Sequence, residues 1–368
     1  MIRHDRSGRA YWINLRVANR LLLFNDFEHL LRYVAHPAEI GAPSWLKNPN
    51  AKSCSAIIAE LSGISLTIRG IQGKKNFVQK TSKKDSRMIR KDAVSWPPRR
   101  YLRRLHRKIL ELRNWLTREL EITDKAGVYR FRCATVREFN RCLKLYSKEP
   151  GTIEWIESEM KPGQVFYDIG ANIGVYTIFA ARRVSPGGKV YAFEPHGPNF
   201  SRLSDNITIN RLQDVVVPCS FALHNTDGYL KFRYRSLNAG TSNSQLFEGS
   251  NGELKLADDQ IIELKNAVRV DALIASRRVA PPQHVKIDID GDEYLILQGM
   301  TSLLKSSDAP LSIQVELNEP HSDAIISFLQ DHHYHLVKKH LTRSAARRMG
   351  RSSDPLHTGS NAIFKRSN

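Results

Sequence analysis

The stretch Val165–Gly174, which reads VFYDIGANIG, decides the fold of this 368-residue chain. An apolar segment of strand length runs into Asp168, continues as a tight loop with Gly170 and Gly174, and leads into a helical pattern at 175–183. Glycines let the backbone turn sharply and approach a ligand closely. In open α/β sheets, ligands bind outside the carboxyl ends of the strands. The stretch therefore predicts a strand, a ligand-binding loop and a helix.

Segments of the same kind follow from about residue 150, where apolar runs of strand length alternate with helical stretches. Repeated β-α-β units predict an α/β fold with a doubly wound, mostly parallel sheet and helices on both faces. Residues 229–235 and 242–270 are predicted to form an insertion with short strands. The remaining strands are predicted at 165–169, 190–193, 215–219, 285–289, 312–317, 335–338 and 362–365, with helices at 175–183, 200–210, 293–304 and 323–330.

The composition of the first loop indicates its ligand. A dinucleotide site needs G-x-G-x-x-G, but Asn172 stands where the middle glycine would be, which argues against an NAD oxidoreductase. A Walker phosphate loop is also absent from the sequence. Asp168, just before the glycines, suits a ligand with a cationic amine, and S-adenosylmethionine carries an amino acid head and a sulfonium but no phosphate. The loop therefore favours S-adenosylmethionine over NAD or ATP.

The ends of the second and third strands add candidate cofactor contacts. Glu194 lies in the segment YAFEP, 24 residues after Gly170, where an acidic side chain can accept hydrogen bonds from both ribose hydroxyls. The structural alternative is that Glu194 caps the helix that begins near Pro198. Ser220 and Phe221 follow the third strand, where the adenine is expected, although an aromatic residue here is as often part of the core.

Residues 284–293, which read HVKIDIDGDE, are expected to carry the chemistry. Strand alternation places Lys286, Asp288 and Asp290 on one face and apolar residues on the other. Charged side chains in a central parallel strand are costly to bury unless they are paired. We therefore expect them at the carboxyl end of the strand, facing the cofactor cleft, where perturbed acids and bases are functional candidates. The structural alternative is a Lys–Asp pair that holds the insertion.

The motifs FYDIGANIGVYT, AFEP and VKIDIDGDE, in this order and followed by a helix with Gly299, resemble the FkbM family of methyltransferases over about residues 130–320. The resemblance implies a class I, Rossmann-like methyltransferase with a seven-stranded sheet, which uses S-adenosylmethionine to methylate hydroxyls of sugars, polyketides or related metabolites. It also implies that Gly240–Asn243 forms a loop over the site. The late motif of the family usually reads K-I-D-V-E-G-x-E, and here Asp290 replaces the glutamate.

The expected mechanism is an in-line methyl transfer in which a carboxylate takes the hydroxyl proton. Asp288 is the predicted base, with Lys286 or Glu316 orienting it, and His196 and His224 are rivals because each follows a strand end. The predicted catalytic residues are Asp288, Lys286 and Glu316, and the predicted cofactor-binding residues are Asp168, Gly170, Asn172, Gly174, Glu194, Ser220, Phe221 and Asp290.

The net charge of +19 comes from the first part of the chain. Residues 1–150 hold 32 Lys and Arg against 13 Asp and Glu, whereas residues 151–368 hold 24 of each. The domains are predicted as a basic, poorly ordered extension at 1–95, an amphipathic helix with a lead-in segment at 96–148, and a methyltransferase domain at 149–368. The charge asymmetry favours an anionic partner. An RNA methyltransferase that binds phosphates through this extension is the alternative function, although no RNA-binding module is recognisable.

Two features of the extension support further hypotheses. Apolar residues at spacings of three or four predict one apolar face of a basic helix, which packs on the catalytic domain or contacts an anionic membrane. Residues 73–91 are polar and basic and are predicted to be disordered, and Met88 within them suggests that the natural protein starts near this residue. The apolar helix positions are Leu102, Leu105, Ile109, Leu112, Leu116 and Leu120.

Composition excludes several other classes. The apolar runs are far shorter than the ~20 residues that cross a bilayer, and no apolar region follows the N-terminus as in a secretory signal.

The histidines within 332–340 lack a carboxylate or cysteine partner at ligand spacing, so no metal site is expected there, and the carboxylates of 288–293 are the alternative Mg²⁺ ligands. Cysteines outside any C-x-x-C pair predict free thiols and a cytoplasmic protein. They are Cys54, Cys133, Cys142 and Cys219.

Overall fold

The computed structural model describes residues 2–4, 10–14, 107, 119–247, 261–289, 291, 293–318, 320–341 and 360–367. The chain divides into two units, of which one comprises Met1–Leu15 with Glu119–Asn368 and the other Arg16–Arg118. The account below concerns the first unit. Within the described residues, every helix is too short or too polar to span a membrane.

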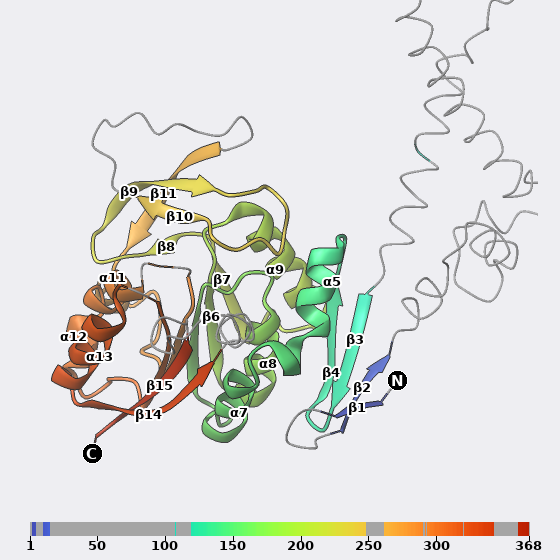
Figure 1. Cartoon of the computed structure of the whole chain (residues 1–368), viewed down its shortest axis with the longest axis horizontal. Helices are drawn as coiled ribbons and strands as arrows, with labels where there is room; N and C mark the ends of the chain where they lie inside the picture. Colours follow the sequence, from blue (N-terminus) through green and yellow to red (C-terminus); the bar gives the residue numbers. More distant parts are fainter. Residues whose placement is uncertain are drawn as a thin grey trace, which may run out of the picture. The chain divides into compact units, whose positions relative to one another are not determined.

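A seven-stranded sheet forms the centre of this unit (Figure 1). Its strand order reverses at β5, and β15 alone runs antiparallel to its neighbours, which is the arrangement of class I methyltransferases. The predicted mostly parallel sheet is therefore present. In spatial order the strands are β14 (Tyr334–Leu341), β15 (Ser360–Arg366), β13 (Ser312–Leu317), β12 (His284–Ile287), β5 (Val165–Ile169), β6 (Lys189–Phe193) and β7 (Val216–Cys219).

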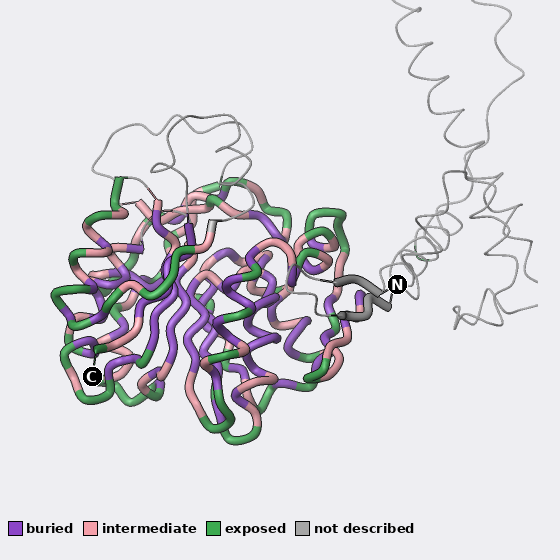
Figure 2. Tube along the Cα trace, turned by 60° about the horizontal axis from the view of Figure 1, so that its bottom comes forward, coloured by how far each residue is buried: buried purple, intermediate pink, exposed green. Residues whose placement is uncertain are grey.

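Alternate residues of the central strands enter two separate hydrophobic cores, because side chains of a strand point to opposite faces in turn. Phe166 and Val190 belong to one core, and Tyr167 and Tyr191 to the other. Both faces of the sheet are therefore covered, which explains why the strands read as nearly continuous apolar runs. Figure 2 shows the strands running through the buried centre of the unit.

The helices divide between the two faces of the sheet, as Figure 1 shows. One core packs against helices that precede or alternate with the first strands, and the other packs against helices of the C-terminal half. The first group is α5 (Val136–Leu143), α6 (Leu145–Lys148), α7 (Pro150–Glu159), α8 (Val175–Val184) and α9 (Gly197–Ile209). The second group is α10 (Val270–Ala275), α11 (Glu293–Gln298), α12 (Thr301–Leu304) and α13 (Ser322–Asp331).

The predicted insertion forms a second sheet of four strands, in the order β10-β9-β11-β8. Its long pair is antiparallel, with Ile261 opposite Tyr234 and Ala267 opposite Gly228. This second sheet lies beside the end of the central sheet at which the parallel strands β5, β6 and β12 have their carboxyl ends (Figure 1). Its strands are β8 (Ala222–Leu223), β9 (Gly228–Tyr234), β10 (Gln245–Phe247) and β11 (Ile261–Val268).

A third sheet precedes the catalytic core and alters the predictions for the N-terminal part. The hairpin of β3 (Glu119–Asp124) and β4 (Gly127–Arg132) pairs with β2 (Ala10–Asn14), which pairs with β1 (Ile2–His4). Strands thus occur within the extension that the sequence predicts to be poorly ordered. Leu120 was predicted on a helix and instead lies buried in β3, because pairing with Phe131 of β4 overrides its helical spacing. The other predicted positions of that helix, and Met88, lie outside the described residues.

Two predicted elements differ in extent or continuity from the prediction. The fourth strand stops at Ile287, so Asp288 lies in the turn beyond it and not within a strand. The helix predicted at 293–304 is divided into α11 and α12 at Gly299. A Cβ atom at Gly299 would lie 2.2 Å from the backbone oxygen of His224, so close packing of two backbones interrupts the helix there.

Candidate active site

A cleft of about 1420 Å³ lies at the carboxyl ends of β5, β6 and β12, where the strand order reverses. This is the position at which open α/β sheets bind ligands. The predicted site residues that line the cleft are Gly170, Asn172, Glu194, Phe221, Asp288 and Glu316. All four residues of the predicted covering loop, Gly240–Asn243, line it too.

The loop after β5 adopts a backbone that favours glycine. Gly170 and Gly174 have φ angles of 82° and 85°, and Gly174 is the residue that caps α8. A Cβ atom at Gly170 would lie 2.0 Å from the backbone oxygen of Asp288. The chain at the end of β5 therefore packs closely against the backbone of Asp288, and a side chain at Gly170 would collide with it.

Replacing Gly170 by Ala is expected to lower the free energy of unfolding by about 1–3 kcal/mol more than replacing Gly163 by Ala, because only the first adds a collision. Gly163 is a matched control, since its φ angle is 84° and a Cβ atom there would meet nothing within 4 Å. Both substitutions carry the strain of a left-handed backbone. Urea unfolding of the two variants measures the difference, and equal losses would contradict the collision.

Three charged side chains form a group beneath the loop, in which Asp168 and Lys286 are buried and Asp288 is 22% exposed. Lys286 is 1% exposed, and its Nζ lies 2.9 Å from Oδ2 of Asp288 and 3.8 Å from Oδ1 of Asp168. Burial would lower the pKa of Lys286, but the two carboxylates hold it above its usual range. Lys286 is thus paired, as the structural alternative required, but its carboxylate partners lie outside the insertion that the pair was expected to hold. It also abuts the cleft through Asp288.

The environment of Asp288 fixes its ionised form. Burial would raise the pKa of Asp288, but the Lys286 ammonium, with help from Lys148, holds it well below its usual range. Asp168 differs, because burial raises its pKa against the opposing effects of Lys286 and of the hydroxyl of Thr177, which donates to Oδ2 at 2.5 Å. Asp168 does not line the cleft, and Asp288 does.

Glu194 faces the cleft from the end of β6, the other neighbour of β5. Its Oε2 accepts the backbone N–H of Asn172 at 2.6 Å, and its Oε1 accepts that of His196 at 2.9 Å. Each oxygen retains a second lone pair for a ligand. The helix cap is His196, whose side chain accepts the N–H of Asn199, so the alternative that Glu194 caps α9 is wrong.

The remaining predicted residues are less well placed or fall outside the description. Ser220, between β7 and β8, is exposed and does not line the cleft, whereas the next residue, Phe221, does. Phe221 lines the cleft while packing against Phe193, with ring centroids 5.8 Å apart. Asp290 lies outside the described residues.

The two rival histidines are poorly suited to accept a proton. His196 lines the cleft, but Nε2 contacts the backbone oxygen of Ser236 at 2.8 Å and Nδ1 accepts from Asn199. His224 is buried outside the cleft lining. Among the described residues, no group of three or more His, Cys, Asp or Glu could hold a metal ion. Cys133, Cys142 and Cys219 are free thiols.

The structure also brings in residues that the sequence prediction missed. Four cations line the cleft: Arg137 and Arg141 of α5, Lys144 between the helices, and Lys148 of α6. Their spacing of four, three and four residues would have indicated one helix face. The covering loop is held by the backbone oxygen of Thr241, which accepts from the side-chain amides of Asn172 at 2.9 Å and Asn199 at 3.0 Å.

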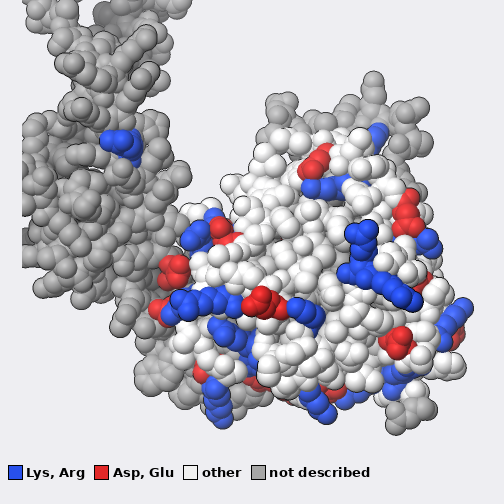
Figure 3. All heavy atoms as spheres, turned by 180° about the vertical axis from the view of Figure 1, so that it is seen from behind, with Lys and Arg blue, Asp and Glu red and all other residues white. Residues whose placement is uncertain are grey.

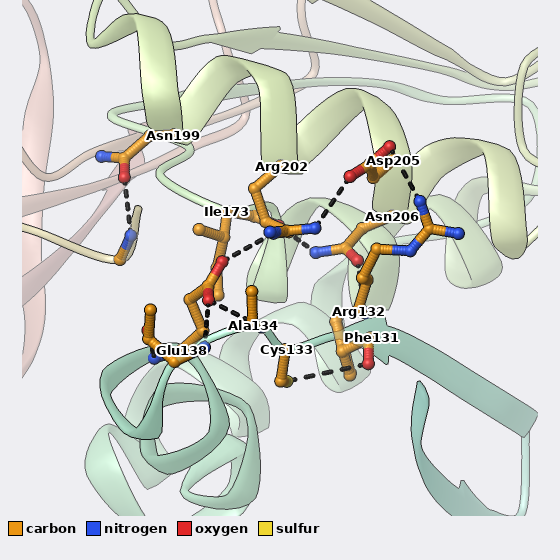
Figure 4. A network of polar contacts seen from close by, with 12 residues as sticks. Phe131, Arg132, Cys133, Ala134, Glu138, Ile173, Asn199, Arg202, Asp205 and Asn206 are labelled. Atoms are coloured by element: carbon orange, nitrogen blue, oxygen red, sulfur yellow. Dashed lines mark hydrogen bonds and ion pairs between the residues drawn. The ribbon is translucent and has the colours of Figure 1, made fainter. Parts of the chain in front are cut away.

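A polar network fixes α5 against α9 (Figure 4). Glu138 is fully buried and forms the capping box of α5 with Thr135. Its Oε1 lies 2.6 Å from Nε of Arg202, which also pairs with Asp205 at 2.8 Å. The cleft-lining cations of α5 are therefore held in place by a partner 64 residues away along the chain.

Comparison with known proteins agrees with this geometry. Residues 168–336 match the family described as the methyltransferase FkbM domain. The chain is similar to the hexuronic acid methyltransferase AglP of Haloferax volcanii, with 28% identity over 207 residues that cover 54% of this chain and 79% of the relative. It is also similar to the 31-O-demethyl-FK506 methyltransferase FkbM of Streptomyces tacrolimicus, with 29% identity over 162 residues, or 39% of this chain and 61% of the relative.

Solved structures resemble the chain more distantly. A methyltransferase FkbM from Methylobacillus flagellatus KT has 13% identity and a TM-score of 0.33, with 62% of this chain and 59% of that chain covered. TYW2 of M. jannaschii, in complex with AdoMet, has 14% identity and a TM-score of 0.34, with 68% and 87% covered. The fold assignment rests on the strand order of the central sheet. The family match and the two curated relatives show that this chain is a methyltransferase, and they confirm that it resembles the FkbM family.

Proposed function

We propose that the chain transfers a methyl group from S-adenosylmethionine to a hydroxyl of a sugar, a glycan or a secondary metabolite. One observation carries the proposal: the carboxylates of Glu194 and Asp288, from the two strands that flank β5, line one cleft with Gly170 between them. The similarity to a hexuronic acid methyltransferase and to a methyltransferase of 31-O-demethyl-FK506 supports this class of acceptor.

The residues around the loop fit such a donor. Glu194 offers acceptor lone pairs for ribose hydroxyls, and the positive φ angle of Gly170 lets the loop turn sharply at the cleft. A small hollow beside the loop, of about 20 Å³, is lined by Arg141, Lys148 and Lys286 together with the Asp288 carboxylate. Because Lys286 pairs with Asp288, Arg141 and Lys148 are the cations that suit the carboxylate of the amino acid head. When bound, the donor supplies an electrophilic methyl group on a sulfonium.

The role proposed for Asp288 is to orient the acceptor hydroxyl and to take its proton. Its low pKa keeps it ionised, so it can accept a hydrogen bond from the hydroxyl throughout the neutral range. Lys286 makes it a weaker base than a free carboxylate, which implies that alignment contributes more than proton transfer. Lys286 itself is a positioning residue, since it holds Asp288 without lining the main cleft.

Affinity for S-adenosylmethionine is expected to fall as the pH drops from 8 to 6, approaching tenfold per unit below pH 7. Burial raises the pKa of Glu194 to about 7, against the hydrogen bonds from His196 and Asn172. Below that pH the carboxyl is protonated and loses acceptor capacity. Calorimetric titration across this range measures the effect.

Two variants identify the group responsible. The variant Glu194→Gln should bind S-adenosylmethionine weakly, and its affinity should not change between pH 8 and 6. Glu293→Gln should retain the pH dependence, although burial also raises the pKa of Glu293 to about 7, because that side chain accepts backbone N–H groups of Ile289 and Gly291. A pH dependence that survives in Glu194→Gln would remove Glu194 from the cofactor site.

The proposed activity is tested with S-adenosylmethionine labelled in its methyl group, incubated with polysaccharide, lipid-linked saccharide and small-glycoside fractions. Label is expected in a carbohydrate or metabolite product as a base-stable ether. Label that appears only in RNA, or protein that does not bind S-adenosylmethionine by calorimetry, would overturn the proposal.

A further inference from the structure

The wall of the cleft formed by α5 and α6 carries a stripe of positive charge. Arg137, Arg141, Lys144 and Lys148 follow each other at steps of four, three and four residues, which places them on one face of a helical path. The path continues through Lys144, whose carbonyl accepts the N–H of Lys148 at 2.8 Å. All four line the cleft, and Arg233 of β9 lines it as well.

The arginines of this stripe are bonded differently from the ion-paired arginines Arg183 and Arg202. Arg183 and Arg202 pair with carboxylates at 3.0 Å and 2.6 Å. In the cleft, Arg137 donates to the hydroxyl of Thr241 at 3.0 Å, and Arg141 donates to the hydroxyl of Ser242 at 2.8 Å. Neutral acceptors position a guanidinium without neutralising it, so the charge remains available to a ligand.

On the surface outside the cleft, positive and negative side chains are interspersed. Figure 3 shows Lys and Arg interspersed with Asp and Glu over one face of the described unit, and residues 151–368 are neutral overall. The cleft also contains the carboxylates of Glu149, Glu194, Asp288 and Glu316, and Lys148 pairs with Glu149 at 2.5 Å. The like charges along Arg137, Arg141 and Lys144 still repel one another, and a bound anion between them would relieve this repulsion. The stripe is therefore a feature of the cleft and not a consequence of composition.

The cofactor accounts for only part of this charge. Arg141 and Lys148 also line the hollow beside Gly170, where the carboxylate of the donor would lie. Arg137, Lys144 and Arg233 line the main cleft but not that hollow. Because the donor also carries a sulfonium and an amine, it does not need three further cations.

We propose that Arg137, Lys144 and Arg233 bind an anionic group of the acceptor, a carboxylate or a phosphate attached to the saccharide that is methylated. This inference rests on the proposed function and names the charge of its acceptor. The Asp288 carboxylate would then face the hydroxyl while the cations hold the anionic end, which fixes the orientation of the acceptor in the cleft.

Binding is measured first, by calorimetry, with glucuronate, glucose 1-phosphate and glucose as probes. Each is titrated into the protein alone and into the protein saturated with S-adenosylhomocysteine. At least one anionic probe is expected to bind about tenfold more tightly than glucose. Preference for glucuronate identifies a carboxylate acceptor, and preference for glucose 1-phosphate identifies a phosphate. Glucose binding as tight as both anions, or no binding of either anion, would overturn the inference.

The double variant Arg137→Gln/Lys144→Gln should remove this preference while its affinity for S-adenosylhomocysteine stays within twofold. Both side chains are exposed, so the fold should persist. Lys125→Gln, at an exposed turn outside the cleft lining, is the matched control and should retain the preference for an anionic probe.

A preference for an anionic probe that survives in the double variant would overturn the assignment. Failure of S-adenosylhomocysteine to bind the unaltered protein would count against the proposed function instead, and the titration of the protein alone still tests the anion site.

Discussion

Replacing Asp288 by Asn is expected to lower turnover about 10²- to 10⁴-fold while S-adenosylmethionine still binds. The substitution keeps the shape of the side chain but removes the charge that orients the hydroxyl and accepts its proton. Lys286 would retain Asp168, 3.8 Å away, as its remaining carboxylate partner. Single-turnover transfer of labelled methyl, compared with calorimetric binding of the donor, separates the two effects.

A matched substitution controls for the change of charge. Asp308→Asn makes the same exchange at an exposed position outside the cleft lining, and it should leave turnover unchanged. If Asp288→Asn retains turnover, Asp288 is not the proton acceptor. Glu316, a cleft carboxylate near the end of β13, is then the next candidate for this role. If the variant also loses donor binding, Asp288 belongs to the cofactor site.

Replacing Glu138 by Ala is expected to destabilise the protein by about 3 kcal/mol, because it removes one partner of a buried ion pair and a helix cap together. The value lies at the lower end for such pairs, since Arg202 is 15% exposed and keeps Asp205. Chemical unfolding followed by circular dichroism measures the loss.

The same network supplies the control. Asp205 is 36% exposed and pairs with Arg132 and Arg202, so Asp205→Ala should cost no more than about 1 kcal/mol. If Glu138→Ala and Asp205→Ala lower the free energy of unfolding equally, burial does not determine how much each ion pair stabilises the protein. Because Glu138 also anchors α5, its loss should weaken binding of anionic probes in the cleft.

The sequence predicted those parts of the fold that depend on local pattern. Strand-length apolar runs around Phe166 and Val190 identified the central strands, and the spacing of Gly170, Gly174 and Glu194 identified the loop and the acidic strand end. These signals are short-range, because a strand with both faces buried needs apolar residues throughout and a left-handed turn needs glycine.

Other parts depended on contacts between distant segments. Leu120 lies in a helical spacing pattern, yet pairing with Phe131 of β4 makes it part of β3. Strand alternation placed Asp288 within the fourth strand, whereas the strand ends one residue before it. The ends of strands are set by where neighbouring segments stop pairing, which no local pattern records.

What the sequence by itself determined about this protein is the order of the central strands and their helices, the glycine loop after β5 and the resemblance to FkbM methyltransferases. Only the tertiary structure decided that Lys286 pairs with Asp288 and lowers its basicity, and that α5 turns its cations into the cleft. The reason is physical. Periodicity fixes which residues share a face, but the direction of that face is set by partners far along the chain, here Arg202 for Glu138.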